Sequence, residues 1–300
     1  MIKIYKINEI SEDQRLDKYL KRQFSNLTQS FIEKNLRKKN ILVNDKTTKS
    51  NFIVKKNDLI KIKNYNENTY QRFVIKKTEK KVNKILKKNF ENSILYENEN
   101  FLVIDKWFGI ATQGGTNINI SIDTIIKSIS PNYNLVHRLD KETTGLLIIA
   151  KNLKYTKIFG DLFKTQKLKK IYLALCAGKP RMKESFVDLL INSKDKTKKI
   201  KTNTFYKLIS NNQKNSLIQF EPKTGKKHQL RLVAKNLGCP IVGDLKYNLN
   251  KSKQKENLKL NAFKLEFVIG KDKYSFKSRL PKDFVDFLIS NKIKFDFNII

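Results

Sequence analysis

The stretch Leu135–Lys151, LVHRLDKETTGLLIIAK, places one aspartate between two apolar runs. The runs NLVHRLD and LLIIAK predict two strands, and the polar residues 141–144 that lead to Gly145 predict the loop that joins them. Asp140 is therefore expected at the edge of a sheet. An aspartate at the start of a turn can cap local backbone N–H groups, so its position alone fits a structural role as well as a catalytic one.

The charge of the chain predicts a polyanionic partner. It carries 63 Lys and Arg against 28 Asp and Glu, a net charge of +35. Cations that neutralise phosphates release condensed counterions, so nucleic acid is the expected partner. The alternative is that the high lysine content, like the high Asn and Ile content, reflects a nucleotide bias toward A and T. Lysine would then be spread over every surface and would indicate no partner. An anionic membrane surface is disfavoured, because the sequence shows no basic amphipathic helix with an aromatic face.

Other classes are disfavoured by what the sequence does not contain. No run approaches the ~18 apolar residues of a membrane span, and no secretory start is visible, so we expect a cytoplasmic protein. Cys176 and Cys239 lie far apart, and His137 and His228 add no ligand spacing. We therefore expect no metal and no disulfide framework.

A small basic module is expected over residues 11–63. The segments EDQRLDKYLKRQF and TQSFIEKNLRKKN have helical apolar spacing, and ILVND and NDLIKI predict strands after them. The expected helices share basic faces, formed by Arg15, Lys18, Arg22, Lys34, Arg37, Lys38 and Lys39. These side chains suit RNA phosphates, although any one of them also suits a solvated helix exterior. MIKIYKINEI predicts a short strand ahead of the module.

A polar segment, residues 64–92, is expected as a linker with some helix, and residues 93–300 form the second unit. Tyr155, Phe159, Leu162 and Phe163 predict a helix, and TGKKHQLRLVAKNLG predicts another that ends before Gly238. Further strands are expected at FLVID, KKIYLALCA, SLIQFEP, LKLNAFKLEFVI and DKYSFKSRL. The sequence thus predicts an α+β fold with a mixed, largely antiparallel sheet and flanking helices.

Two resemblances give these units a function. RLDKYLKR, TQSFIEKNLRKKNILVND and VKKNDLIKI resemble the S4 RNA-binding domain. HRLDKETTGLLIIAK, KKIYLAL, KTGKKHQLRL and CPIVGDLKYN occur in the order found in RluA-type pseudouridine synthases of the branch with an N-terminal S4 domain. The second resemblance covers nearly the whole chain, and its Asp-centred motif is highly specific.

That resemblance implies an enzyme that detaches a uracil at N1, turns it and rejoins it through C5, without cofactor or metal. It implies that Asp140 is the catalytic carboxylate, as nucleophile at the ribose or as base toward C2′. Arg231 matches the basic partner of that aspartate. Tyr172 matches the tyrosine that packs against the target base, with a part in proton removal at C5 left open. Arg138 matches an arginine that occupies the space left by a flipped base.

Three positions depart from the family pattern, namely Trp107, Lys226 and Asn261, and none is a proposed catalytic group. The expected substrate is 23S ribosomal RNA, and the expected state is a monomer. The alternatives are a synthase that acts on transfer RNA and a non-catalytic ribosome- or RNA-binding protein with an S4 domain. A nuclease or deaminase is disfavoured, since neither clustered carboxylates nor a Cys/His zinc set is present.

Overall fold

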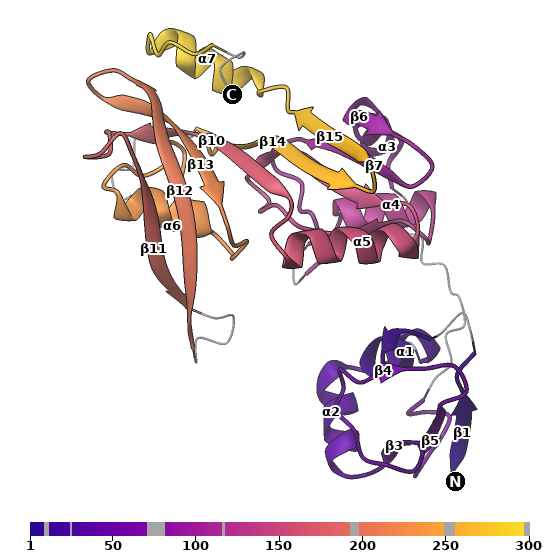
Figure 1. Ribbon diagram of the computed structural model, residues 1–300. Coiled ribbons are helices and arrows are strands. Elements are labelled where there is room, and N and C mark those ends of the chain that lie inside the picture. The colour runs from indigo at the N-terminus through magenta and orange to yellow at the C-terminus, as the bar shows by residue number, and fades with distance from the viewer. Residues whose placement is uncertain are drawn as a thin grey trace. The chain divides into compact units, whose positions relative to one another are not determined.

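The protein forms two compact units, Met1–Thr78 and Glu79–Ile300 (Figure 1). The computed structural model describes residues 1–8, 12–24, 26–70, 82–115, 118–192, 198–248 and 256–296. Both units combine helices with sheets, which confirms the expected α+β class.

The N-terminal unit packs two helices against small sheets. Its elements are β1 (Lys3–Lys6), β2 (Gln14–Arg15), α1 (Leu16–Gln23), α2 (Gln29–Arg37), β3 (Ile41–Val43), β4 (Ile53–Val54) and β5 (Leu59–Ile62). The strands form a sheet of order β1-β5-β3 and a β2-β4 pair. Helix α2 begins where the Thr28 side chain accepts a hydrogen bond from the Phe31 N–H, a standard N-cap. Leu16, Leu20, Phe24 and Ile32 fill the core.

This unit extends past the expected limits of 11 and 63 on both sides. Strand β1 pairs with β5 before residue 11, and Tyr65 stacks on Tyr70 with ring centroids 5.3 Å apart. Both tyrosines lie in the core beside Phe24, which explains why the chain after β5 stays with this unit. Residues 71–81 of the expected linker lie outside the described residues. Its last part is helix α3 (Lys84–Asn92), which Asn83 caps.

The C-terminal unit is built on a ten-stranded sheet of order β11-β12-β13-β10-β14-β9-β7-β6, with β15 on β14 and β8 on β9. Among the strand pairs of the described residues, only β9 and β14 run parallel, so the sheet is mixed and largely antiparallel as expected. The strands and helices after α3 are β6 (Ile94–Glu97), β7 (Phe101–Lys106), α4 (Ile122–Ile129), β8 (Asn134–Leu135), β9 (Thr144–Ala150), α5 (Leu153–Lys164), β10 (Lys169–Ala177), β11 (Glu184–Asn192), β12 (Lys199–Asn211), β13 (Asn215–Pro222), α6 (Gln229–Asn236), β14 (Leu260–Ile269), β15 (Asp272–Lys277) and α7 (Lys282–Ser290).

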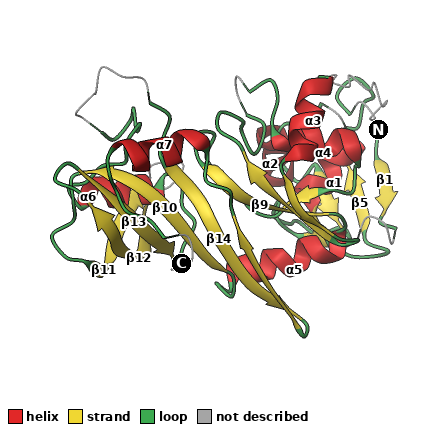
Figure 2. Cartoon of the chain, turned by 90° about the horizontal axis from the view of Figure 1, so that it is seen from above, coloured by secondary structure: helices red, strands yellow, loops and turns green. Residues whose placement is uncertain are grey.

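Strand β9, TGLLIIA, is buried along its whole length because helices cover both faces of the sheet there. Leu147 and Ile149 face the apolar side chains of α4, whereas Leu146 and Ile148 face Phe159 of α5. Alternate residues of a strand point to opposite faces, so each helix takes every second side chain. Figure 2 shows α4 and α5 on opposite sides of the strands.

Two expectations about this unit were wrong in extent. NLVHRLD forms only the two-residue strand β8, and residues 136–143 form a loop. The chain leaves the sheet because the His137 ring takes the strand's place: its Nε2 accepts the Ile148 N–H at 2.9 Å. The sequence also did not predict β6, β11, β12, α4 and α7; of these, β11, α4 and α7 carry apolar side chains that are exposed to solvent.

The close approach of β9 and β14 gives a stability prediction. Gly145 has φ +103°, and a Cβ there would lie 2.4 Å from the Ala262 carbonyl oxygen. We expect Gly145→Ala to lower the free energy of unfolding by about 3 kcal/mol. Gly160→Ala is the control, since nothing lies within 4 Å of its Cβ position in α5. It should raise stability by roughly 0.5–1 kcal/mol. Urea unfolding of both variants checks this, and equal effects would contradict it.

Candidate active site

The loop that carries Asp140 is held on both sides by the segment that follows β7. Thr112 Oγ1 donates to the Leu139 carbonyl at 2.7 Å and accepts the Leu139 N–H at 3.1 Å. On the other side, the Gly109 N–H donates to the Lys141 carbonyl at 3.1 Å. Leu139 itself is buried, while the Asp140 side chain keeps 21% of its surface exposed. The carboxylate is therefore fixed at its base and open to a ligand.

Lys106, at the end of β7, lies beneath this loop and was missed in the sequence. Its side chain is buried, and Nζ donates to the carbonyls of Trp107, Ile110 and Lys141 at 3.1, 3.1 and 3.3 Å. Three acceptors match the three N–H donors of an ammonium group. Burial lowers the pKa of Lys106 to about 7, and the charge of Asp140 opposes that shift. Lys106 ends the run FLVIDK, and nothing in the sequence distinguishes it from the other lysines until the fold buries it.

The His228 ring faces Asp140, with Nε2 3.8 Å from Oδ2, which is beyond hydrogen-bond distance. Its Nδ1 lies 2.9 Å from the Tyr247 hydroxyl. Because a carboxylate faces Nε2, the proton is favoured there, and Nδ1 then accepts from Tyr247. Burial lowers the pKa of His228, Asp140 opposes the shift, and the charges of Arg231 and nearby lysines add to it. The imidazole facing Asp140 is thus neutral at pH 7.

The backbone of His228 is strained, and the hydrogen bonds of the next residue, Gln229, hold it in this conformation. His228 has φ +57°, a left-handed conformation that non-glycine residues seldom adopt. Gln229 is buried, and its Oε1 accepts from the Thr224 hydroxyl and the Lys226 N–H, while its Nε2 donates to Thr204 Oγ1. Strain of this kind persists only where surrounding contacts fix it. Lys226, one of the departures from the family pattern, takes part through its backbone alone in this contact.

Arg231 does not bond Asp140 directly, contrary to expectation. Its Nε and NH2 form a bidentate pair with Asp244 at 2.7 and 2.6 Å, and its NH1 bonds Glu142 at 2.9 Å. Burial lowers the pKa of Arg231, but Asp244, Glu142 and the more distant Asp140 together raise it. Glu142 lies two residues after Asp140, so Arg231 ties α6 to the Asp140 loop. It acts on Asp140 through position and charge.

Tyr172 lies on β10 opposite Phe220 and Ala262. It packs against the clusters on both sides of the site. Burial, and after it the charge of Asp140, raises the pKa of Tyr172 well above its usual value. The hydroxyl therefore keeps its proton at neutral pH. Its ring can pack against a base, but an unaided role in taking a proton from C5 is disfavoured.

The other residues around the loop have structural places. His137 stacks on Phe163 with centroids 4.6 Å apart, and burial followed by the charge of Lys170 lowers its pKa to about 3. Arg138 is exposed beside it. Asn261, another departure, is buried and donates to Thr144 Oγ1 at 2.9 Å. Trp107, the third, packs against the cluster around α4.

The described residues contain neither a metal-binding cluster nor a membrane-spanning helix. No group of three or more His, Cys, Asp and Glu side chains there could hold a metal ion. No helix among them is long and apolar enough to cross a membrane. Cys176 and Cys239 are both buried and reduced.

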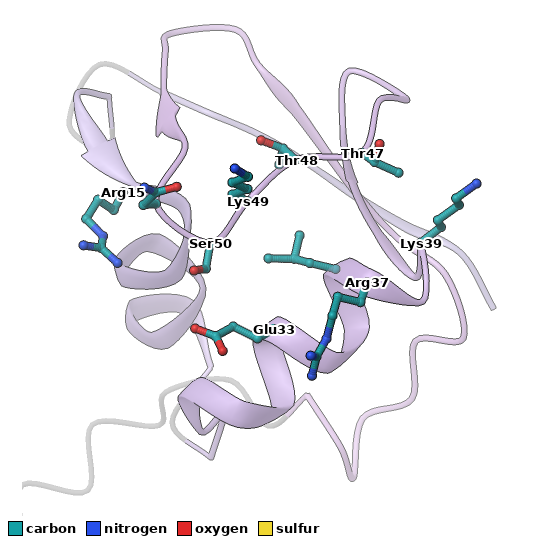
Figure 3. A pocket seen from close by; sticks show the side chains of 10 residues that line it. Arg15, Glu33, Arg37, Lys39, Thr47, Thr48, Lys49 and Ser50 are labelled. Atoms are coloured by element: carbon teal, nitrogen blue, oxygen red, sulfur yellow. The ribbon is translucent and has the colours of Figure 1, made fainter. Parts of the chain in front are cut away.

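The N-terminal unit has a basic hollow of about 770 Å³ between α2 and the chain before β4 (Figure 3). Its cations are Arg15, Arg37, Lys39 and Lys49, beside hydroxyls from residues 47, 48 and 50. Three of the residues expected to contact RNA, Arg15, Arg37 and Lys39, therefore line it. Lys18, Lys34 and Lys38 are exposed but do not line it. Arg15 is also paired with Asp17 at 2.6 Å.

Comparison with known families defines the class of protein: a pseudouridine synthase with an N-terminal S4 domain. Residues 14–60 match the family model of the S4 domain, and residues 100–236 match that of RNA pseudouridylate synthase. The second match includes Asp140, Tyr172 and Arg231.

Individual relatives, matched over most of their length, belong to the same class. The chain is 41% identical over 295 residues to ribosomal large subunit pseudouridine synthase C of Rickettsia felis, which covers 91% of this chain and 95% of the relative. It is 37% identical to ribosomal large subunit pseudouridine synthase D of Borreliella burgdorferi, over 69% of this chain and 71% of the relative. The structure of human RNA pseudouridylate synthase domain containing 4 aligns with a TM-score of 0.63 at 25% identity, over 70% of this chain and 97% of the other. The chain therefore belongs to the RNA pseudouridylate synthase family.

Lys106 gives a pH prediction. Its pKa is about 7 in the folded protein and ~10.4 in an unfolded chain, so between these values the unfolded state binds more protons. Stability from this group therefore rises with pH. From pH 7 to pH 9 the free energy of unfolding should increase by about 2 kcal/mol more in the wild type than in Lys106→Met.

Urea unfolding followed by Trp107 fluorescence measures this, because Trp107 is the one tryptophan and lies in the C-terminal unit. The variant removes the Lys106 donor from the carbonyls of Trp107 and Ile110 at both pH values, while the Lys141 carbonyl keeps the Gly109 N–H, so it should be less stable throughout. If the two proteins showed parallel pH dependence, the ammonium of Lys106 would not be the group that titrates.

Proposed function

We propose that this protein converts uridine to pseudouridine in large-subunit ribosomal RNA, with Asp140 as the catalytic carboxylate. The observation that carries the proposal is the geometry around Asp140: contacts from Thr112, Gly109 and Lys106 fix its loop, while the carboxylate itself stays partly exposed. The names of relatives such as the Rickettsia felis and Borreliella burgdorferi proteins support the substrate class.

The carboxylate can act by either of two routes. As a nucleophile it would attack the ribose, and as a base it would remove the C2′ proton. Both routes need a negatively charged, oriented oxygen. The loop contacts from Thr112 and Gly109 supply orientation without blocking the exposed side of Asp140, and the His228 ring lies beside the carboxylate. The ring of Tyr172 supplies a wall for the uracil, and the residues need no cofactor for this isomerisation.

To reach Asp140, the target uridine must leave its stack, which costs a few kcal/mol. Arg138 is exposed two residues before Asp140, so it can fill the vacated space while the base is in the site. The basic hollow of the N-terminal unit would contact phosphates elsewhere on the same RNA. Such contacts position the protein without specifying sequence, and a folded RNA loop would provide recognition.

The test of the chemistry is Asp140→Asn. The amide keeps the shape of the side chain but can act neither as a nucleophile nor as a base. We expect tritium release from C5-labelled uridine in a large-subunit rRNA transcript to fall at least about a thousandfold, with RNA affinity nearly unchanged. Asp286→Asn, an exposed carboxylate on α7, is the control and should keep full activity. An Asp140→Asn enzyme that retained more than a few percent of the rate would reduce Asp140 to a turn residue.

The test of the hollow is Arg37→Gln. Removing one phosphate contact should weaken RNA binding and reduce the slope of log affinity against log salt by roughly 0.7–0.9. Lys6→Gln changes an exposed lysine on β1 that does not line the hollow and should leave the slope unchanged. Fluorescence anisotropy across a salt series measures both. Equal slopes in the two variants would show that the hollow makes no specific phosphate contact.

A further inference from the structure

A second, smaller hollow of about 200 Å³ lies in the C-terminal unit, where the chain leaves α5 and enters β10. It is lined by Gln166, Leu168, Lys169, Lys170, Glu221, Pro222 and Lys223. None of these residues is among the groups around Asp140 described above.

Two of the three lining lysines, Lys170 and Lys223, have no carboxylate partner among the described residues. Burial lowers the pKa of Lys170, and the nearby charge of Lys223 lowers it further. Among the described residues neither lysine forms an ion pair. The Glu221 carboxylate accepts from Gln219 at 2.7 Å, and Lys169 faces Glu266 at 3.9 Å. A partly desolvated cation beside a second cation is unfavourable in the unliganded protein, so an anion in the hollow would relieve it.

The hollow adjoins the Asp140 site along two segments. Lys170 precedes Tyr172 by two residues on β10, about 7 Å along a strand, and Tyr172 responds to the charge of Asp140. The charge of Lys170 also reaches His137, at the start of the Asp140 loop. Lys223 begins the segment that ends at His228. A chain of nucleotides with one base at Asp140 can therefore place a neighbouring phosphate here.

We propose that this hollow binds a backbone phosphate of the RNA, beside the uridine that enters the site. Lys170 and Lys223 supply the charge, and the side-chain amide of Gln166 supplies a hydrogen-bond donor. Lysine binds phosphate as a point charge, so two of them suit a group with charge on several oxygens. The inference rests on the proposed function, and family membership favours RNA over a protein carboxylate as the source of the anion.

The test compares Lys170→Met and Lys223→Met with Lys271→Met. Lys271 is an exposed lysine at the turn between β14 and β15 and does not line the hollow. Each hollow variant should bind a fluorescent large-subunit rRNA transcript roughly tenfold more weakly and lose about 0.7–0.9 from the salt slope. Without RNA, Lys170→Met should raise the thermal midpoint of the C-terminal unit by roughly 2–4 °C, because the repulsion is gone. The control should change neither.

This pairing of lower affinity with higher stability separates a binding group from a structural one. A lower midpoint in Lys170→Met would make the lysine structural, and an affinity and slope equal to those of Lys271→Met would mean that no phosphate binds; either result overturns the proposal. If millimolar inorganic phosphate raised the wild-type midpoint while RNA affinity stayed the same in all variants, the hollow would serve a small phosphorylated molecule instead. Pseudouridine formation by the wild type is scored separately, so its absence would refute the proposed function itself.

Discussion

The buried ammonium of Lys106 is the contact on which the geometry of the site depends. It bonds carbonyls from the segment after β7 and from the loop that carries Asp140, and that loop has no strand pairing of its own between residues 136 and 143. Thr112 and Gly109 add bonds on the two sides of Asp140. A carboxylate on an open loop would sample many orientations. Here a cation and three backbone contacts restrict it while leaving its outer face accessible.

A second layer of contacts joins this loop to α6. Arg231 bonds Glu142 in the loop and Asp244 beyond the helix, and His228 at the helix start faces Asp140. The four residues HQLR therefore have different roles. His228 faces the Asp140 carboxylate, and Gln229 holds the strained backbone. Leu230 packs in the core, and Arg231 joins α6 to the Asp140 loop. In a chain with net charge +35, the buried Arg231 is paired with two carboxylates, whereas Lys170 and Lys223 of the smaller hollow form no ion pair among the described residues.

The sequence predicted the architecture well where apolar periodicity was strong. It placed β7, β9, β10 and β14, because these strands are buried and rich in branched side chains. It expected Asp140 at the end of a strand, whereas Asp140 lies in the loop of residues 136–143. It did not predict the partner of Arg231, since Asp244 and Glu142 lie 13 and 89 positions away. Nor did it predict Lys106: a single lysine among 63 basic residues gives no signal until the fold buries it.

We propose that the groups around Asp140 modify uridines of large-subunit ribosomal RNA. The most direct measurement is a carbodiimide-based map of pseudouridine in ribosomal and transfer RNA from cells with and without the gene. We expect defined pseudouridines to vanish from the large-subunit RNA and to return when the gene is restored. Loss confined to transfer RNA would contradict the substrate, and an unchanged map would contradict the enzyme's proposed role altogether.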